Sequence, residues 1–361
     1  MTRVSDELLR AALADAADTV RPEALRPLPA RPQRRRRLRA APLGGLAVAA
    51  AATIAVVLLV APWSQHRRDG ASPAFSLAAY TGIDYVLDGP WPTGGQWVRV
   101  RKADTGRQIA TLPAPKGSSG FRDSADSGDN RTFVLTTADP QACSVRFYRL
   151  TLGADGRPKE GLTELRRATL RQQIGEGPDQ LAVSRQTRRI AFAGKECGGA
   201  SARGVITVVD PATGEQRVTR LPPRALASSL RWAPNGRELV FETMGDYLER
   251  TLQTLDTATG RISPVPLGIG DGMLCGAAFD KDGTHIVALV RNGRQNRVLW
   301  YSTVTKTITR QVPLPPSAPD AATMFEVSGD RIVAVIGDRV HVVTGTKVTT
   351  GRVGEDSMAM P

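Results

Sequence analysis

The chain has 361 residues, of which 41% are hydrophobic and only 5% aromatic, so its length accommodates one large domain or two ordinary ones. Its net charge is +13, but residues 1–40 alone hold ten arginines against five acidic residues. The rest has no long block of like charge, which argues against a nucleic-acid partner. Three histidines and three cysteines argue against a zinc or haem site with many protein ligands, and no cofactor is expected.

Residues 1–40 predict a short cytosolic tail. Ser5 is suited to cap a helix in which Leu8, Leu9 and Leu13 share one face. The segment after this helix is rich in proline and arginine, which predicts disorder. Two interpretations remain open: a solvated tail that sets the membrane topology, or a docking peptide within residues 1–30 for a cytosolic partner.

Residues 41–63 predict a single transmembrane helix. No charged residue occurs from residue 40 to residue 63. The 21 residues from Leu43 to Trp63 cover about 31 Å as a helix, close to the thickness of the hydrocarbon core of a bilayer. A buried core helix is the alternative, but such helices are usually shorter and carry a polar face. The lipid bilayer is therefore an expected partner of this segment.

The flanking charges predict the orientation of this helix. Five arginines lie directly before it, namely Arg34, Arg35, Arg36, Arg37 and Arg39. Only Arg67 and Arg68 follow closely, so the positive-inside rule places the N-terminus in the cytoplasm and exports everything after Trp63. A cleavable signal peptide is the alternative, although its apolar core usually has only about 7–15 residues. We therefore expect a signal anchor in the cell membrane, followed by a stalk over residues 64–79.

Residues 80–352 contain repeated short strands and turns. Similar strand–turn–strand segments begin at Leu181, Leu230 and Gly276, spaced by 46–49 residues, and weaker copies begin at Phe121 and Phe325. An Asp-x-x-Thr-Gly hairpin recurs between them, in which glycine supplies the positive φ of the turn. Such a period with four short strands per unit is typical of propeller blades, whereas a sandwich would not repeat its turns at fixed intervals. The expected units are 80–115, 121–176, 177–227, 228–273, 274–321 and 322–352.

This pattern predicts an all-β fold, a β-propeller of about six four-stranded blades. The first and last units look incomplete, and the segment from Phe75 to Gly82 would supply a missing outer strand of the last blade and close the ring. Alternation at residues 98–101 and the apolar run at 205–209 fit strands packed between neighbouring blades. Residues 353–361 are expected to form a flexible C-terminus.

The turn segments resemble those of known propellers. APNGRELVF from Ala233 and DKDGTHIVAL from Asp280 resemble the strand–turn–strand of TolB-type and WD-repeat-like β-propellers, and VVDPATG from Val208 resembles their second hairpin. The resemblance extends over residues 80–352 but loses the Pro-Asp-Gly turn at residues 184–187. The layout of tail, span and exported propeller is similar to uncharacterised actinobacterial exported propeller proteins. The resemblance implies the fold and says little about chemistry.

The groups needed for nucleophilic catalysis are not assembled in the sequence. No Gly-x-Ser-x-Gly occurs, and the nearest pattern, residues 117–120, lies in a loop rich in proline and glycine. His66, His285 and His341 are each isolated, which favours packed or surface histidines over general bases. Residues 268–272 lack the helix and the lysine of a phosphate-binding loop. We therefore expect no enzymatic activity.

Two acidic turns admit a functional interpretation. Residues 124–128 resemble the opening of a sialidase Asp-box, and Asp280, Asp282 and Gly283 resemble part of a calcium loop. Calcium takes about six to eight oxygen ligands, more than this loop offers. Both segments occupy the position of the generic blade turn, so we favour a structural role and expect no metal site.

The three cysteines all lie after the predicted span, on the side where oxidation takes place. Cys143 and Cys197 follow equivalent strands of adjacent units, so we expect a disulfide between them. It would close a loop of about 55 residues and contribute on the order of 2–4 kcal/mol. Cys275 has apolar neighbours and is expected to be a buried free thiol.

These features favour a membrane-tethered extracytoplasmic propeller that serves as a binding or scaffold module for a protein, peptide or glycan. One alternative is a transmembrane regulator whose N-terminal segment docks a cytosolic factor. Another is a sialidase- or lactonase-like propeller enzyme, which would need carboxylates gathered at the central channel.

Overall fold

The computed structural model describes residues 84–89, 95–103, 105–174, 180–198, 203–244, 250–319, 321 and 323–352. The predicted tail 1–40, span 41–63, stalk 64–79 and C-terminus 353–361 lie outside these ranges, as do Arg34, Arg35, Arg36, Arg37 and Arg39. Among the described residues, no helix has the length and apolar character needed to cross a bilayer. A 3-10 helix, η3 (Arg166–Ala168), interrupts a part of the chain that is otherwise strands and turns.

The described strands form six antiparallel sheets, which we number in chain order. The first sheet contains β1 (Tyr85–Asp88), β2 (Trp97–Lys102) and β3 (Gln108–Pro113). The second contains β4 (Phe121–Asp126), β5 (Thr132–Asp139), β6 (Ser144–Thr151) and β7 (Thr163–Glu164). The third contains β8 (Gln172–Ile174), β9 (Leu181–Val183), β10 (Ile190–Glu196), β11 (Gly204–Val209) and β12 (Gln216–Arg220).

The remaining three sheets have four strands each. The fourth contains β13 (Leu226–Trp232), β14 (Glu238–Met244), β15 (Arg250–Asp256) and β16 (Arg261–Pro264). The fifth contains β17 (Met273–Phe279), β18 (His285–Asn292), β19 (Gln295–Ser302) and β20 (Ile308–Leu314). The sixth contains β21 (Thr323–Ser328), β22 (Arg331–Ile336), β23 (Arg339–Thr344) and β24 (Lys347–Arg352).

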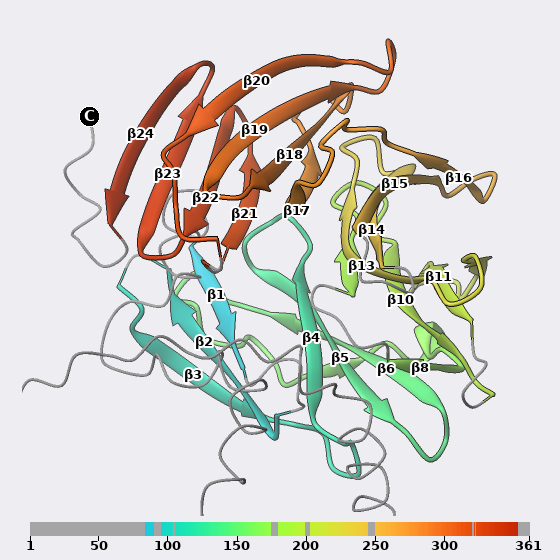
Figure 1. The fold of residues 1–361 in the computed structure, drawn as a ribbon. Coiled ribbons are helices and arrows are strands. Elements are labelled where there is room, and N and C mark those ends of the chain that lie inside the picture. Colours follow the sequence, from blue (N-terminus) through green and yellow to red (C-terminus); the bar gives the residue numbers. More distant parts are fainter. Residues whose placement is uncertain are drawn as a thin grey trace, which may run out of the picture. The chain divides into compact units, whose positions relative to one another are not determined.

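The sheets are the blades of a six-bladed β-propeller. In five of the described sheets, strands that follow one another in sequence are hydrogen-bonded neighbours, so these sheets are meanders. In the third sheet β9 to β12 form the meander, and β8 also pairs with β10. Figure 1 shows the sheets around a common centre, with β4, β13, β17 and β21 nearest to it and β16 and β24 at the outside. The predicted all-β propeller of about six blades is confirmed.

Two details of the blade assignment were wrong. The last sheet is complete, because residues 323–352 alone supply its four strands, so it has no missing outer strand for Phe75 to Gly82 to fill. The sheet with three described strands is the first, and residues 75–82 lie outside the described ranges. In addition, β8, which we had placed in the second unit, pairs with β10 in the third sheet.

Adjacent blades are joined by apolar side chains from both faces of their strands. In β18, Ile286 and Ala288 pack into a cluster shared with the fourth sheet, whereas Val287 and Leu289 pack into one shared with the sixth. Successive side chains of a strand point to opposite faces, so a strand between two blades is apolar at consecutive positions. The run of buried residues in β11 has the same cause.

The connections between strands lie at two ends of the blades. In a four-stranded meander the first and third connections lie at one end, and the second lies at the other end with the crossover to the next blade. We call the first end the turn rim; the β17–β18 turn belongs to it. We call the second end the loop rim; the β5–β6 and β10–β11 connections belong to it.

Candidate functional site

The turn between β17 and β18 is a tight backbone loop at the turn rim. Its ends are held by hydrogen bonds from the Asp280 N–H to the His285 carbonyl (3.0 Å) and from the Gly283 N–H to the Asp280 carbonyl (3.1 Å). Gly283 has a φ of +72°, a conformation that side-chain-bearing residues rarely adopt. The Asp282 carboxylate accepts the Thr284 N–H at 2.7 Å and stabilises the bend.

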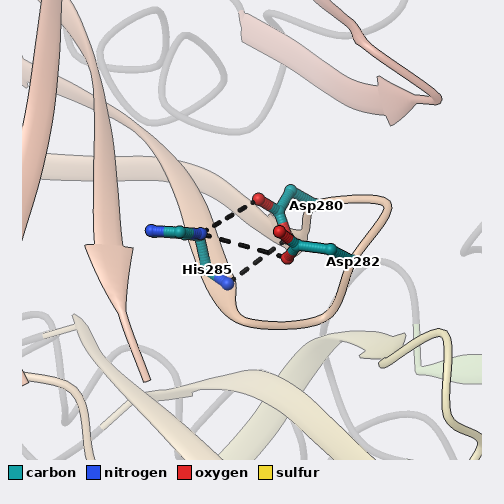
Figure 2. Close-up of side chains that lie close together, drawn as sticks. All are labelled: Asp280, Asp282 and His285. Carbon is teal, nitrogen blue, oxygen red and sulfur yellow. Dashed lines mark hydrogen bonds and ion pairs between the residues drawn. The ribbon is translucent and has the colours of Figure 1, made fainter. Parts of the chain in front are cut away.

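Side chains of this turn gather around the Nδ1 atom of His285, and Figure 2 shows the two carboxylates among them. Asp280 Oδ2 lies 3.3 Å from this nitrogen and Asp282 Oδ1 lies 3.9 Å from it. The Thr284 hydroxyl lies 3.0 Å from the same nitrogen and donates a hydrogen bond of 2.7 Å to Asp282 Oδ1. The prediction that His285 is isolated was wrong: its ring faces two carboxylates.

The two carboxylates differ in their electrostatic surroundings. Burial and the neighbouring Asp282 carboxyl raise the pKa of Asp280 above its ordinary value. Hydrogen bonds with Asp280 and from Thr284 lower the pKa of Asp282. The two carboxyl groups of the turn therefore differ in how readily they release a proton.

The turn that resembles an Asp-box joins β4 to β5. Gly128 has a φ of +83°, and a Cβ placed there would lie 2.8 Å from the side chain of Arg185, so this glycine serves a close approach of two blades. Asp126 Oδ1 is buried without a hydrogen-bond partner in the described structure. Burial raises the pKa of Asp126 to about 6. The residues fit a structural turn that contains one buried carboxyl group.

The predicted cysteine pair forms a disulfide at the loop rim. Cys143, in the β5–β6 connection, is joined to Cys197, which follows β10, with a Cα–Cα distance of 6.1 Å. The bond therefore links the second and third blades. Cys275 is a free thiol that is only partly buried beside the apolar cluster of the fifth and sixth sheets, and burial raises its pKa.

The other sequence candidates have packing or loop roles. His341 is 2% exposed on β23, its Nδ1 lies 3.0 Å from the Thr350 hydroxyl, and burial lowers its pKa. Ser119 of the 117–120 segment donates a hydrogen bond to the Ala138 carbonyl. His66 lies outside the described ranges.

A small cleft lies between the outer hairpins of the third and fourth sheets. Its volume is about 170 Å³ and its lining combines two arginines, two carboxylates and three smaller residues. These are Arg189, Arg217, Asp210, Glu215, Val208, Thr257 and Ala258. Arg217 donates to the Thr257 carbonyl at 3.1 Å, which ties the two hairpins together across the cleft. Ligand pockets usually exceed about 300 Å³, so the cleft is suited to a side chain or a single small group.

No protein-family model matches the chain, and no curated protein is significantly similar to it in sequence. Among solved structures it is similar to TolB from Acinetobacter baumannii, with 17% identity and a TM-score of 0.46, over 78% of this chain and 68% of that one. It is also similar to hydrazine synthase from Kuenenia stuttgartiensis, with 15% identity and a TM-score of 0.46, over 72% and 73%. A third is the Cps50 (Swd1) β-propeller domain from Myceliophteria thermophila, with 12% identity and a TM-score of 0.45, over 75% and 83%. These similarities concern the fold alone, which the sheets above establish by themselves.

Proposed function

We propose that this chain is a membrane-tethered extracytoplasmic β-propeller that acts as a binding or scaffold module for a protein, peptide or glycan. The observation that carries the proposal is the disulfide between Cys143 and Cys197. Disulfides persist in oxidising compartments and are rare in the cytosol, so this bond supports an exported propeller.

The sequence pattern before the propeller supports the same location. The uncharged segment 41–63 is long enough to span a bilayer, and Arg34 to Arg39 precede it. A span in this orientation exports the chain that contains both cysteines. The charge pattern and the disulfide are independent features and support one topology.

The proposed binding role follows from how the blades are built. The faces of the blades pack against neighbouring blades through apolar clusters, such as those on both sides of β18. The rims are polar and carry connections of different length on a rigid scaffold, an arrangement that suits recognition. We therefore assign binding to a rim rather than to the outer edges of the blades.

Protease accessibility tests the location. The full chain would carry one epitope before Met1 and another after Pro361, and protease would be added to intact spheroplasts. The proposal predicts loss of the C-terminal epitope and protection of the N-terminal one. Protection of both epitopes, or loss of the N-terminal one alone, would contradict it.

Site-specific cross-linking tests the binding role. A photoreactive amino acid would replace Arg203 at the loop rim, Val304 at the turn rim or Val218 on the outer strand β12 in the membrane-bound chain. All three positions are exposed, with Val304 at 75% and Val218 at 51%. We expect a defined cross-linked product from one rim and none from Val218. Equal labelling at all three positions would indicate random encounter and reject the assignment.

A second function is favoured by the amphipathic pattern of residues 5–20. In the helix expected from the sequence, Leu8, Leu9 and Leu13 would share one face on the proposed cytosolic side, which is suited to dock a cytosolic factor. The chain would then signal propeller occupancy across the membrane. Replacing Leu9 and Leu13 with lysine should abolish co-purification of a specific cytosolic protein with the full chain. If the wild-type chain retains no such protein either, the regulatory function is rejected.

A further inference from the structure

We propose that Asp280, Asp282, Thr284 and His285 form a binding site for a divalent transition-metal cation, with Zn²⁺ as the reference ion, at the turn rim of the fifth blade. This inference does not depend on the membrane location or on the binding partner proposed above. It rests on the geometry of the donor atoms, on their chemistry and on a comparison with the equivalent turn of the fourth blade.

The distances between the donor atoms are those of ligands that share one small cation. Ligands about 2.0–2.2 Å from a tetrahedral or octahedral ion lie about 2.8–3.6 Å from one another. His285 Nδ1 lies 3.3 Å from Asp280 Oδ2 and 3.0 Å from Thr284 Oγ1. The Asp282 distance of 3.9 Å is wider, and this oxygen also accepts the Thr284 N–H and hydroxyl. Because the Asp282 side chain is 54% exposed, ion binding could draw its carboxylate closer at the expense of the bond from the hydroxyl.

Direct pairing between the imidazole and the carboxylates explains these distances less well. A charge-assisted hydrogen bond from nitrogen to a carboxylate oxygen is typically about 2.7–2.9 Å long. Both histidine–carboxylate distances exceed this range. Figure 2 shows both carboxyl groups directed toward the ring, so a cation between the ring and the carboxyl groups would lie close to all three.

The equivalent turn of the fourth blade shows that these side chains are not needed for the fold. There the Ala233 N–H donates to the Glu238 carbonyl and the Gly236 N–H donates to the Ala233 carbonyl, as in the fifth blade. Asn235 takes the place of Asp282 and accepts the Arg237 N–H at 2.8 Å. The same backbone therefore forms with alanine, asparagine and glutamate at the positions of Asp280, Asp282 and His285. The fifth blade therefore has an imidazole and a carboxylate where the fourth has glutamate and alanine, and a second carboxylate in place of the Asn235 amide.

The donor set selects the type of ion. Imidazole nitrogen suits zinc, copper and nickel, whereas calcium takes about six to eight oxygen ligands. One nitrogen, two carboxylates and a hydroxyl match a first-row transition cation. Because all ligands come from one rim turn that is open to solvent, further coordination positions remain for water or for a carboxylate of a binding partner.

Metal titration of the full chain in detergent, without an affinity tag, tests the proposal. Zn²⁺ binding would be followed by calorimetry and Co²⁺ binding by its visible absorption, with Ca²⁺ as the competing hard ion. The variants are His285→Ala, Asp280→Asn and Asp282→Asn. The last retains the oxygen that accepts the Thr284 N–H, as Asn235 does in the fourth blade, so its turn should form. Asp155→Asn is the matched control, because Asp155 stabilises an exposed turn of the second blade in the same way, through the Arg157 N–H.

The expected result is one high-affinity Zn²⁺ per chain, with affinity at least about tenfold weaker in each of the three cluster variants and unchanged in Asp155→Asn. Calcium should not displace zinc at equal concentration. The proposal is overturned if the wild-type chain binds no stoichiometric Zn²⁺ or Co²⁺. It is also overturned if His285→Ala, with wild-type circular dichroism, binds as tightly as the wild type, or if calcium competes equally.

Discussion

The two rims of the propeller hold neighbouring blades together in different ways. At the turn rim, consecutive turns touch through their glycines: a Cβ at Gly236 would lie 2.9 Å from Ser184 of the third blade, and one at Gly283 would lie 3.3 Å from Pro234 of the fourth. At the loop rim the links are side chains, namely the Cys143–Cys197 disulfide and the buried Arg291, which donates to the Pro319 and Ala321 carbonyls.

This difference separates the roles of backbone and side chains. At the turn rim a glycine of each of these turns lies close to side chains of the preceding turn, and polar links such as Arg188 to Ser127 at 3.0 Å add to this contact. The Asp280 and His285 side chains take no part in these links between blades. At the loop rim the connections differ from blade to blade, and individual side chains must fix each one. We therefore expect the stability of the protein to fall when single side chains are lost at the loop rim and when atoms are added at the turn rim.

The largest effect is expected from opening the disulfide at the loop rim. The double variant Cys143→Ser, Cys197→Ser should lose on the order of 2–4 kcal/mol of unfolding free energy, since the cross-link no longer restricts the unfolded chain. Denaturant unfolding of the full chain measures this loss. Cys275→Ser is the control and should change stability much less. Equal effects of the two variants would show that the link between the second and third blades does not depend on the disulfide.

A smaller effect is expected from a methyl group added at the turn rim. Gly236 and Gly283 have similar φ values of +65° and +72°, so alanine should cost about 1–2 kcal/mol of strain at either position. Gly236→Ala should cost about 1 kcal/mol more, because its Cβ also presses on Ser184 and Thr187. The difference between the two melting temperatures isolates the contact between turns. Equal melting temperatures for the two variants would show that neighbouring turns do not press against each other.

The smallest effect concerns the turn between β4 and β5 and depends on pH. The pKa of Asp126 in the folded chain is about 6, against an ordinary value of 3.8. Folding therefore takes up a proton between these values, and the stability due to this group falls as pH rises from about 4 to 6. Asp126→Asn should raise the free energy of unfolding by about 1–2 kcal/mol at pH 7.5 and by almost nothing at pH 4.

Asp129 is the matched control for this prediction. Burial acts to raise its pKa, but hydrogen bonds from Arg131 and Thr132 outweigh burial and lower it. Stability due to Asp129 is present above the unfolded pKa and is lost as pH falls, so Asp129→Asn should have the opposite sign at neutral pH. If both variants shift stability in the same direction at pH 7.5, the account of Asp126 is wrong.

The propeller could be predicted because its turns repeat a strict local requirement. Gly236 and Gly283 stand at equivalent positions because each bend needs positive φ, so the sequence marks these blades where they turn. The corresponding turn of the third blade has no glycine, and Arg188 takes the positive φ there. Strand pairing is less local. Nothing in residues 172–174 shows that they pair with β10 rather than with the preceding blade, since that choice depends on contacts distant in sequence.

The disulfide pair followed from the fold, because equivalent loops of adjacent blades are neighbours. The cluster at His285 was not predicted, because His285 begins an apolar strand and this strand pattern carries no information about the turn before it. The bend between Asp280 and His285 brings residues five apart into contact. The spacing Asp-x-Asp-x-x-His across a glycine turn was the available signal.

The central claim is that the propeller is exported and that a disulfide links its second and third blades. The redox state of the cysteines in intact cells tests this claim most directly. Free thiols would be alkylated before lysis, and peptides would be mapped without reduction. The account predicts that Cys143 and Cys197 are recovered as one linked peptide pair and that Cys275 carries the alkyl group. Recovery of Cys143 and Cys197 as alkylated thiols, or of Cys275 in a disulfide, would contradict it.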